Sequence, residues 1–508
     1  MFVRKLKSRN GNIQVQVIEK IERNNRVVKH LGTARNNLET QQLITLAQQF
    51  IDEARIKSGK VSFFDTRYSQ SEMSSFLSHL VALGAYDSVT FHFFNYFYHS
   101  FGFDEFADDV FRDLVIARIV YPVSKARTRD WLESKLGYRH SYSLTTLYRT
   151  MEKVYRLNYQ KRLETSIWDF TTKTMSTNIS VLFFDVTTLY YEAFDEDDLR
   201  RCGYSKDRKD NQPQLVIALT VTTQGIPLHI KVFAGNKFEG HTMIPCIKEI
   251  IDSHQLKDFV VVADSAMVSM SNRSSLQDEG LKFIVGARLG NLSQKVFDQI
   301  TDSVPRVDGS SRRFTLEKGQ TLIVNYSTKR ANKDRADRNK QLTRAKYALS
   351  SPSVITRRYK FLKKAEKTGW ELNQLNLDKT EKLEGLKGYV TNAIELTNEE
   401  VIGKYSELWQ VEKSFRISKS DLKARPIFHT VQQKIEAHIS IVFASLAIVR
   451  YVEITTDKSL QKVLDLLDQI QEVVLKDPTS GEVFSKYTQA DNPEILALLK
   501  HANIDWVM

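Results

Sequence analysis

Hydrophobic and polar residues alternate along roughly the first 35 residues of the chain. The stretches FVRKLK, NIQVQVIEKI and RVVKHLG are separated by the turn-forming stretches RNGN and RNNR. Alternation of period two between such turns predicts a small antiparallel β-meander. A helical pattern follows at residues 38–57.

From about residue 85 to residue 178 the hydrophobic period is that of helices. Pro122 ends the amphipathic stretch FADDVFRDLVIARIV, and Ser124 and Ser143 are placed to cap the next two helices. A short capped helix that carries Arg149 and follows another helix after a turn is typical of a helix-turn-helix DNA reader. An ordinary helical bundle has the same pattern, so both interpretations stay open at this point.

From residue 180 to residue 290 the pattern changes to that of strands, with two helical stretches between them. Near-continuous apolar runs such as VLFF and FVVVA predict a sheet that helices cover on both faces. Residues 291–395 interrupt this pattern with strand-like stretches on either side of a basic helical one, which predicts an inserted, mostly β subdomain. The later run IVFASLAIV is too short to span a membrane and predicts a buried helix.

Length and composition bound the class of protein. A chain of 508 residues predicts two to four domains, and 42% hydrophobic with 26% charged residues is typical of a globular protein. The charged start MFVRKLKSRNG differs from a signal peptide, so we expect a cytoplasmic, nucleoid-associated protein without a membrane partner. The two cysteines, Cys202 and Cys246, form no paired metal-ligand motif.

The net charge of +12 is unevenly distributed. Between Lys329 and Lys367 the chain has fourteen lysines and arginines against three acidic residues. Such a block is often only a solvated face, but in a basic chain it indicates a polyanionic partner, with nucleic acid as the leading candidate.

Two apolar strands each end in an aspartate, VLFFD at Asp185 and VVVAD at Asp264. In open α/β sheets the reactive crevice lies at the carboxyl ends of the strands, so the two carboxylates are expected at one place. Neighbouring carboxylates repel each other, and a hard divalent cation removes that repulsion. Glu412, in KYSELWQVEKSFRISKSDL, is the candidate third carboxylate. The alternatives are loop-capping aspartates and a glutamate on a solvated helix.

These residues and their order resemble the DDE transposases of bacterial insertion sequences. The stretch from Tyr405 to Lys419 is similar to the Tyr-x2-Arg-x3-Glu-x6-Lys helix signature of that group, with Leu408 standing where the signature has arginine. The stretches GYSKDRKDNQPQ, GIPLHIKVFAGNKFEGHT and FRISKSDLKARPIFH add to the resemblance. It implies an α/β ribonuclease-H-like catalytic core in which the carboxylates occupy the first strand, the fourth strand and a late helix.

The resemblance also implies a reaction. Asp185, Asp264 and Glu412 would hold two Mg²⁺ ions, or Mn²⁺, and cleave and join DNA at terminal inverted repeats before insertion into target DNA. A hairpin intermediate is one route that relatives with this signature take. Synapsis of two DNA ends implies a homodimer on double-stranded DNA.

On this basis we divide the chain into six parts. They are an N-terminal β-meander and helix (1–60), a helical DNA-binding region (61–178), the first part of the core (179–290), the basic β-rich insertion (291–395), the second part of the core with the Glu helix (396–455) and a helical tail (456–508).

Several polar residues outside the carboxylate triad are candidate DNA contacts. They are Tyr405, Lys419, Arg416, Lys206, Lys209, Asn236, Arg149 and Trp370. Tyr405 and Lys419 belong to the signature, Arg416 is placed to supply the charge that Leu408 lacks, and Trp370 could stack on an unpaired base. Helix packing, solvation and a small core around Trp370 are the structural alternatives.

Two other functions use the same residues. A nuclease with this core would cut DNA without joining it, and a DNA-binding regulator would have lost activity. The complete set of three carboxylates argues against the regulator.

Overall fold

The computed structural model describes most of the chain. The described residues are 1–7, 12–21, 24–34, 39–40, 43–47, 50–51, 79–136, 142–192, 194–204, 211–265, 270–350, 359–365, 369–488 and 492–505. They divide into two compact units, Met1–Leu83 with Leu475–Phe484, and Gly84–Val474 with Ser485–Met508.

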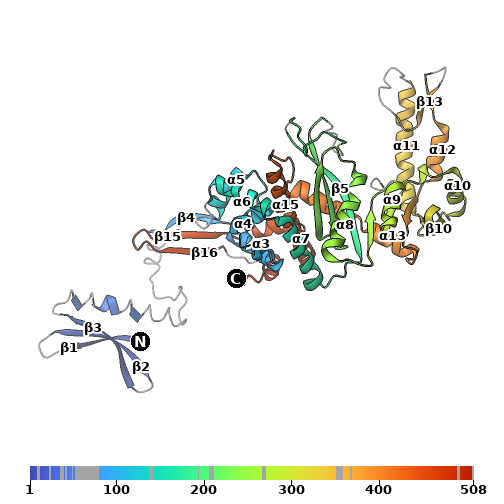
Figure 1. Cartoon of the computed structure of the whole chain (residues 1–508). Helices are drawn as coiled ribbons and strands as arrows, with labels where there is room; N and C mark the ends of the chain where they lie inside the picture. Colours follow the sequence, from blue (N-terminus) through green and yellow to red (C-terminus); the bar gives the residue numbers. More distant parts are fainter. Residues whose placement is uncertain are drawn as a thin grey trace. The chain divides into compact units, whose positions relative to one another are not determined.

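The first unit contains the predicted β-meander (Figure 1). Strands β1 (Phe2–Lys7), β2 (Ile13–Ile21) and β3 (Asn24–Ala34) pair antiparallel in the order β1-β2-β3. Alternate residues of β2, Val15 and Val17, are buried against Ala47 and Ile51. The alternation in NIQVQVIEKI therefore has its expected cause, one face of a strand packed on a small core.

The second unit is organised around an eight-stranded sheet in the order β10-β11-β14-β9-β8-β5-β6-β7. Its strands are β5 (Val181–Tyr190), β6 (Gln214–Val221), β7 (Pro227–Ala234), β8 (Val260–Ala263), β9 (Lys282–Ala287), β10 (Ser311–Thr315), β11 (Thr321–Tyr326) and β14 (Leu386–Thr391). Strands β5, β8 and β9 are parallel, and the other pairings are antiparallel. Every residue of β6 is buried, which requires cover on both faces because successive side chains point to opposite sides.

The region predicted to be helical, from about residue 85 to residue 178, contains five α-helices among the described residues. They are α3 (Ser88–Ser100), α4 (Asp109–Val120), α5 (Lys125–Lys135), α6 (Leu144–Arg156) and α7 (Tyr159–Asp169). The side chains of Ser124 and Ser143 accept hydrogen bonds from the backbone N–H groups of Arg127 and Thr146, which confirms both predicted caps.

Helices α4, α6 and α7 pack against α15 (Gln432–Thr456), which contains the run IVFASLAIV. Helix α15 is the one described helix that is long and apolar enough to cross a membrane, but 89% of its most apolar window is buried inside the protein. The prediction of a buried helix is therefore confirmed.

The insertion contains more helix than the predicted mostly β subdomain, and three of its strands belong to the central sheet. Strands β10, β11 and β14 extend the central sheet, while α10 (Gln294–Ser303), α11 (Thr328–Ser350), α12 (Gln374–Lys382), β12 (Leu362–Ala365) and β13 (Gly369–Leu372) make up the rest of its elements. In Figure 1, α11 and β13 project beyond the end of the sheet at which β10 lies. The stretch around α12 was expected to be a strand, but Asn373 caps a helix there by accepting a hydrogen bond from the backbone N–H of Asn376.

The predicted Glu helix consists of two helices separated by a short turn. Helix α13 (Asn398–Ser406) and helix α14 (Trp409–Arg416) are followed by a π-helical turn, η8 (Ile417–Asp421). A capping box between Thr397 and Glu400 begins α13. Tyr405, Leu408 and Phe415 are buried, so the apolar members of the predicted shared face do pack on the core.

The region predicted as a helical tail (456–508) contains strands as well as helices, so that prediction was incomplete. Helices α16 (Leu460–Leu467) and α17 (Pro493–Lys500) flank β15 (Glu472–Lys476) and β16 (Val483–Tyr487). These two strands form a three-stranded sheet with β4 (Val81–Tyr86), in the order β16-β15-β4. The stretches EVVL and VFSKY favour strands because branched and aromatic residues suit a pleated surface.

Candidate active site

Strands β5 and β8 bring two aspartates to neighbouring positions. The strands are parallel, with Phe184 opposite Ala263, so the next residues of the two chains are Asp185 and Asp264. One oxygen of Asp185 accepts a hydrogen bond of 2.7 Å from the backbone N–H of Val186. The parallel register thus places the two carboxylates at neighbouring positions. The prediction that both strands end at their aspartate is right for β8 and wrong for β5, which continues past Asp185 to Tyr190 in its pairing with β6.

Asp264 is held by the first residue of the signature, Tyr405. The Tyr405 hydroxyl donates a hydrogen bond of 3.2 Å to Asp264 Oδ1, and its ring packs edge-on against Tyr389 with 5.0 Å between ring centroids. A Cβ on Gly286 would lie 2.5 Å from the Tyr405 oxygen, so glycine at this position of β9 leaves room for the tyrosine. Burial, followed by the charge of Asp264, raises the pKa of Tyr405 above its ordinary value, and the hydroxyl therefore stays a proton donor.

Asp264, Tyr405 and Glu412 share one cavity of about 400 Å³. Its lining also includes Leu408, Gly286, Gly388, Arg330 and Lys387. Glu412 is exposed on the first turn of α14, and Asp185 is outside the lining. Among the described residues, no three His, Cys, Asp or Glu side chains lie close enough together to hold a metal ion.

Two cations that were not among the sequence candidates face this cavity. Lys387 lies on β14 and Arg330 on the first turn of α11, both in the insertion. Burial is the largest cause that lowers the pKa of Lys387, the charge of Arg330 adds to it, and the charges of Asp264 and Glu412 oppose it. Lys387 lies in GLKGYV, and a lysine within an apolar strand is the signal that could have identified it.

The remaining predicted residues lie elsewhere. Arg416 is exposed at the end of α14 and is not part of the cavity lining. Lys419 lies in η8 and lines a separate void of about 20 Å³ with Thr187 and Phe415. Asn236 is exposed two residues beyond β7.

Arg149 and Trp370 do not line the cavity that contains Glu412. Arg149 is exposed on α6 and lines a second cavity, of about 880 Å³, with Lys153 and Arg156. Trp370 packs against the small core of the insertion, with Lys364 Nζ 5.9 Å from its ring centroid. Lys206 and Lys209 lie outside the described residues.

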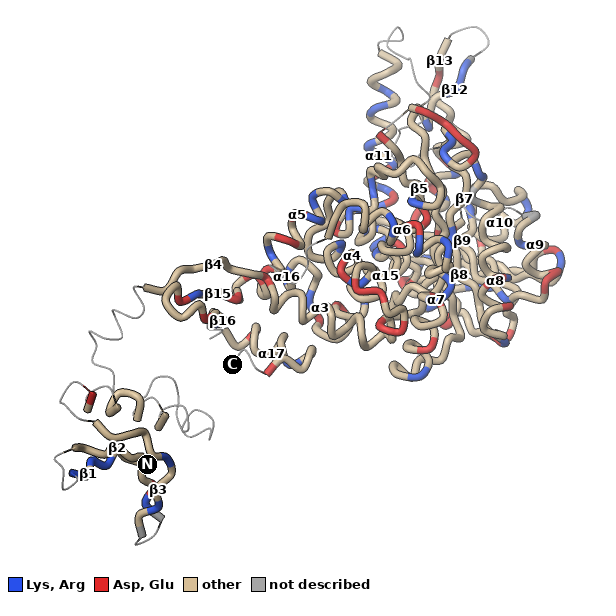
Figure 2. Tube along the Cα trace, turned by 60° about the vertical axis from the view of Figure 1, so that its left-hand side comes forward, with Lys and Arg blue, Asp and Glu red and all other residues tan. Residues whose placement is uncertain are grey.

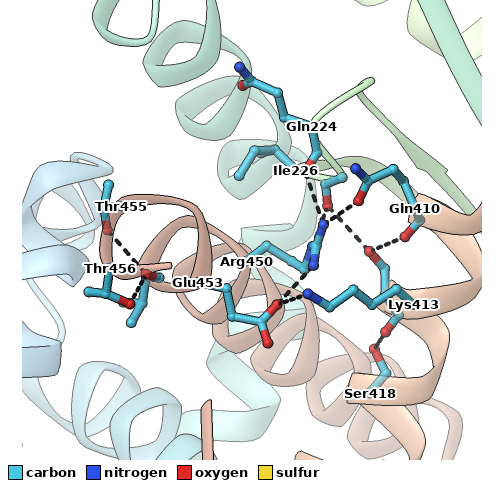
Figure 3. A network of polar contacts seen from close by, with 12 residues as sticks. Gln224, Ile226, Gln410, Lys413, Ser418, Arg450, Glu453, Thr455 and Thr456 are labelled. Atoms are coloured by element: carbon cyan, nitrogen blue, oxygen red, sulfur yellow. Dashed lines mark hydrogen bonds and ion pairs between the residues drawn. The ribbon is translucent and has the colours of Figure 1, made fainter. Parts of the chain in front are cut away.

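A buried arginine fixes the helix that carries Glu412 (Figure 3). Arg450 of α15 donates hydrogen bonds to the carbonyls of Gln224 at 2.9 Å and Gly225 at 3.1 Å, and to Gln410 Oε1 of α14 at 2.5 Å. Glu453 pairs with Arg450 and with Lys413 of α14, each at 2.8 Å. We call these residues the Arg450 network.

The Arg450 network requires a glycine in the turn between β6 and β7. Gly225 has φ +85°, and a Cβ there would clash with the Arg450 guanidinium. Ser414 of α14 also donates a hydrogen bond of 3.2 Å to the Gly225 carbonyl. This network was not predicted from the sequence, although a single arginine directly after the apolar run IVFASLAIV indicates a buried ion pair.

The chain matches one family model and is similar to several solved structures. The model of a family described as transposase DDE domain matches residues 176–448. A solved structure titled as a piggyBac transposase synaptic complex with hairpin DNA has a TM-score of 0.38 and 11% identity, and the match covers 70% of this chain and 68% of that one. A TM-score this low carries no structural argument. No curated protein matches the chain.

Replacing Arg450 tests the network as a stabilising contact. Arg450→Met removes the cation between Glu453 and the Gln224–Gly225 turn, and we expect the free energy of unfolding to fall by about 3 kcal/mol because both ionic side chains are buried. Chemical denaturation measures the change. Arg416→Gln, on the exposed end of α14, is the matched control and should change stability by less than about 0.5 kcal/mol. Equal stability of the two variants would contradict this role for Arg450.

Proposed function

Because the chain belongs to the transposase DDE domain family, whose model matches residues 176–448, we propose that it moves a DNA element by cleaving and joining DNA strands. The observation that carries this proposal is the cavity that Asp264, Tyr405 and Glu412 share. It places two of the three predicted carboxylates and the signature tyrosine around one opening, although α14 and β8 are far apart in sequence.

The order of the core elements supports a ribonuclease-H-like catalytic domain. Counted from β5, Asp185 lies on the first strand, Asp264 directly follows the fourth strand, β8, and Glu412 lies on the later helix α14. This is the placement that the resemblance to insertion-sequence transposases implies.

We propose that Asp185, Asp264 and Glu412 hold Mg²⁺, or Mn²⁺, in the reacting complex. Their oxygen donors suit a hard cation, and the adjacent positions of Asp185 and Asp264 create the repulsion that a divalent ion removes. Tyr405 is not itself a proposed metal ligand, and its hydrogen bond to Asp264 orients the carboxylate of that ligand. When bound, two divalent ions would supply an activated oxygen nucleophile and stabilise the leaving oxygen.

The distribution of charge supports DNA as the partner. Lysines and arginines recur along α11 in Figure 2, and Lys329, Lys333, Lys340, Arg344 and Lys346 are exposed there. Arg335 and Arg338 are instead paired with Glu384, at 3.3 and 2.6 Å, and hold α11 to the segment before β14. The exposed cations would contact phosphates, which gives affinity and salt dependence rather than sequence choice.

The finer features of the proposal follow the resemblance. The DNA ends would be terminal inverted repeats of an insertion sequence, brought together by a homodimer. The free 3′-hydroxyl of a nicked strand would then attack the opposite strand to form a hairpin, or target DNA to complete insertion.

Glu412→Gln tests the carboxylate directly. With a duplex ending in the inverted repeat that borders the coding sequence, Mg²⁺ and a plasmid target, we expect cleavage and joining to fall by more than the roughly 10- to 100-fold typical of removing a group that only orients a metal ligand. Gel electrophoresis of the products measures both steps. Glu407→Gln, an exposed glutamate in the turn before α14, is the matched control and should retain activity. Normal joining by Glu412→Gln would refute the site, whereas cleavage without joining by the unaltered protein would identify a nuclease.

Tyr405→Phe tests the support of Asp264. Removing the hydroxyl should raise the Mg²⁺ concentration for half-maximal cleavage by roughly 10- to 100-fold, because the carboxylate is no longer oriented by its hydrogen-bond donor. A Mg²⁺ titration of cleavage measures this, and excess Mg²⁺ should restore the rate. Tyr389→Phe keeps the neighbouring ring and leaves the Asp264 bond intact, so its titration should match that of the unaltered protein. A normal titration for Tyr405→Phe would contradict the role.

A further inference from the structure

Two cations from the insertion line the cavity that contains Asp264 and Glu412. Lys387 reaches it from β14, whose Gly388 is opposite Ala287 of β9, so its backbone belongs to the same sheet as Asp264. Arg330 reaches it from the first turn of α11. The positive charge in the cavity therefore comes from β14 and α11, and not from the helices α13 and α14 that carry the signature residues.

The ammonium group of Lys387 is held by aromatic rings. Its Nζ lies 4.5 Å from the ring centroid of Tyr405 and 5.5 Å from that of Tyr389. In the described part of the chain it forms no ion pair within 4.0 Å, so its three N–H donors are not neutralised by a carboxylate in contact. Lys387 is half-buried, and partial burial of an ammonium group without a carboxylate in contact is unfavourable, which indicates a site for a negatively charged ligand.

Arg330 is oriented by one acidic neighbour. Its Nε lies 3.4 Å from Asp334 Oδ2, and the same oxygen accepts a hydrogen bond of 3.1 Å from the backbone N–H of Gly385. The Arg330 side chain keeps 44% of its surface exposed. Since a guanidinium has five N–H donors, the contact with Asp334 leaves donors for a ligand in the cavity.

Leu408 stands where the signature has arginine, so this position supplies no positive charge to the cavity. Leu408 is buried, and it lines the cavity together with Tyr405 and Glu412. A leucine cannot bind phosphate, and Arg416 lies outside the lining. Lys387 and Arg330 are the cations that line this cavity among the described residues.

We propose that Lys387 and Arg330 bind the DNA backbone beside Asp264 and Glu412, and so replace the signature arginine that is absent at Leu408. This inference rests on the proposed function for the identity of the ligand. The phosphate is a backbone phosphate at the cleaved end of the DNA, and its negative charge offsets the two cations.

Salt dependence of DNA binding tests the interaction without requiring catalysis. With a fluorescent duplex ending in the bordering inverted repeat and with Ca²⁺ present, the slope of log K against log salt should fall by about 0.9 for each phosphate that Lys387→Met/Arg330→Gln no longer binds. Lys248→Met/Lys462→Met removes two exposed charges elsewhere and is the matched control, with an unchanged slope expected. An unchanged slope for the first double variant would overturn the proposal.

Folding and catalysis are separated in the same experiment. Thermal unfolding monitors each variant, and Arg330→Gln alone, at an exposed residue, carries the slope measurement if Lys387→Met does not fold. If the unaltered protein binds DNA but never cleaves it with Mg²⁺ or Mn²⁺, the proposed function fails while the slope still decides whether these cations bind phosphate. If the unaltered protein cleaves DNA and the double variant has an unchanged slope, phosphate binding by Lys387 and Arg330 is overturned while the proposed function stands.

Replacing single DNA phosphates with neutral groups identifies the phosphate that Lys387 and Arg330 bind. Replacing single phosphates near the cleaved bond with methylphosphonates should slow single-turnover cleavage at the bound position about tenfold or more, as removal of a charge-assisted hydrogen bond does. In Lys387→Met the same replacement should slow cleavage no further, and Lys387→Arg should restore most of the rate. Additive effects at every position would show that Lys387 only packs against the tyrosines and would overturn its role as a ligand.

Discussion

The buried guanidinium of Arg450 connects three separate parts of the molecule: the turn between β6 and β7, helix α14 and helix α15. A cation in this position must satisfy its donors, because few other groups are available to it away from water. Gln410 and Lys413, on either side of Glu412, contact Arg450 or its partner Glu453. The position of an exposed acidic residue thus depends on polar contacts on the opposite, buried side of its helix.

Local elements of this fold could be predicted because their signals are local. VLFF and VVVA were predicted as strands because they are short apolar runs, and Ser124 and Ser143 cap helices by contacts within three residues. The resemblance to the family came from the order of Asp185, Asp264 and Glu412 together with the stretch from Tyr405 to Lys419. The pairing of β14 with β9, and with it the location of Lys387, depends on contacts between distant segments and has no local signal.

The same limit applies to the basic residues. Composition alone suggested that the whole block from Lys329 to Lys367 binds a polyanion. In the structure, Arg338 pairs with Glu384 within the insertion, whereas Arg330 lines the cavity that contains Asp264 and Glu412. Trp370 likewise packs in the small core around Phe361. Arg416 follows Glu412 by one helical turn, yet this spacing was not enough to place it in the cavity. Which residues are available to a ligand is decided by tertiary partners.

The strands of the insertion continue the hydrogen-bonded sheet of the core without a break, from β9 through β14 and β11 to β10. A segment joined in this way does not behave as an exchangeable module. Grafting the insertion of a relative into this chain would replace Lys387 and Arg330, and thus part of the wall around Glu412, together with the outer basic surface. Changes in the outer basic surface and changes in the wall of the cavity around Glu412 would therefore occur together in this architecture.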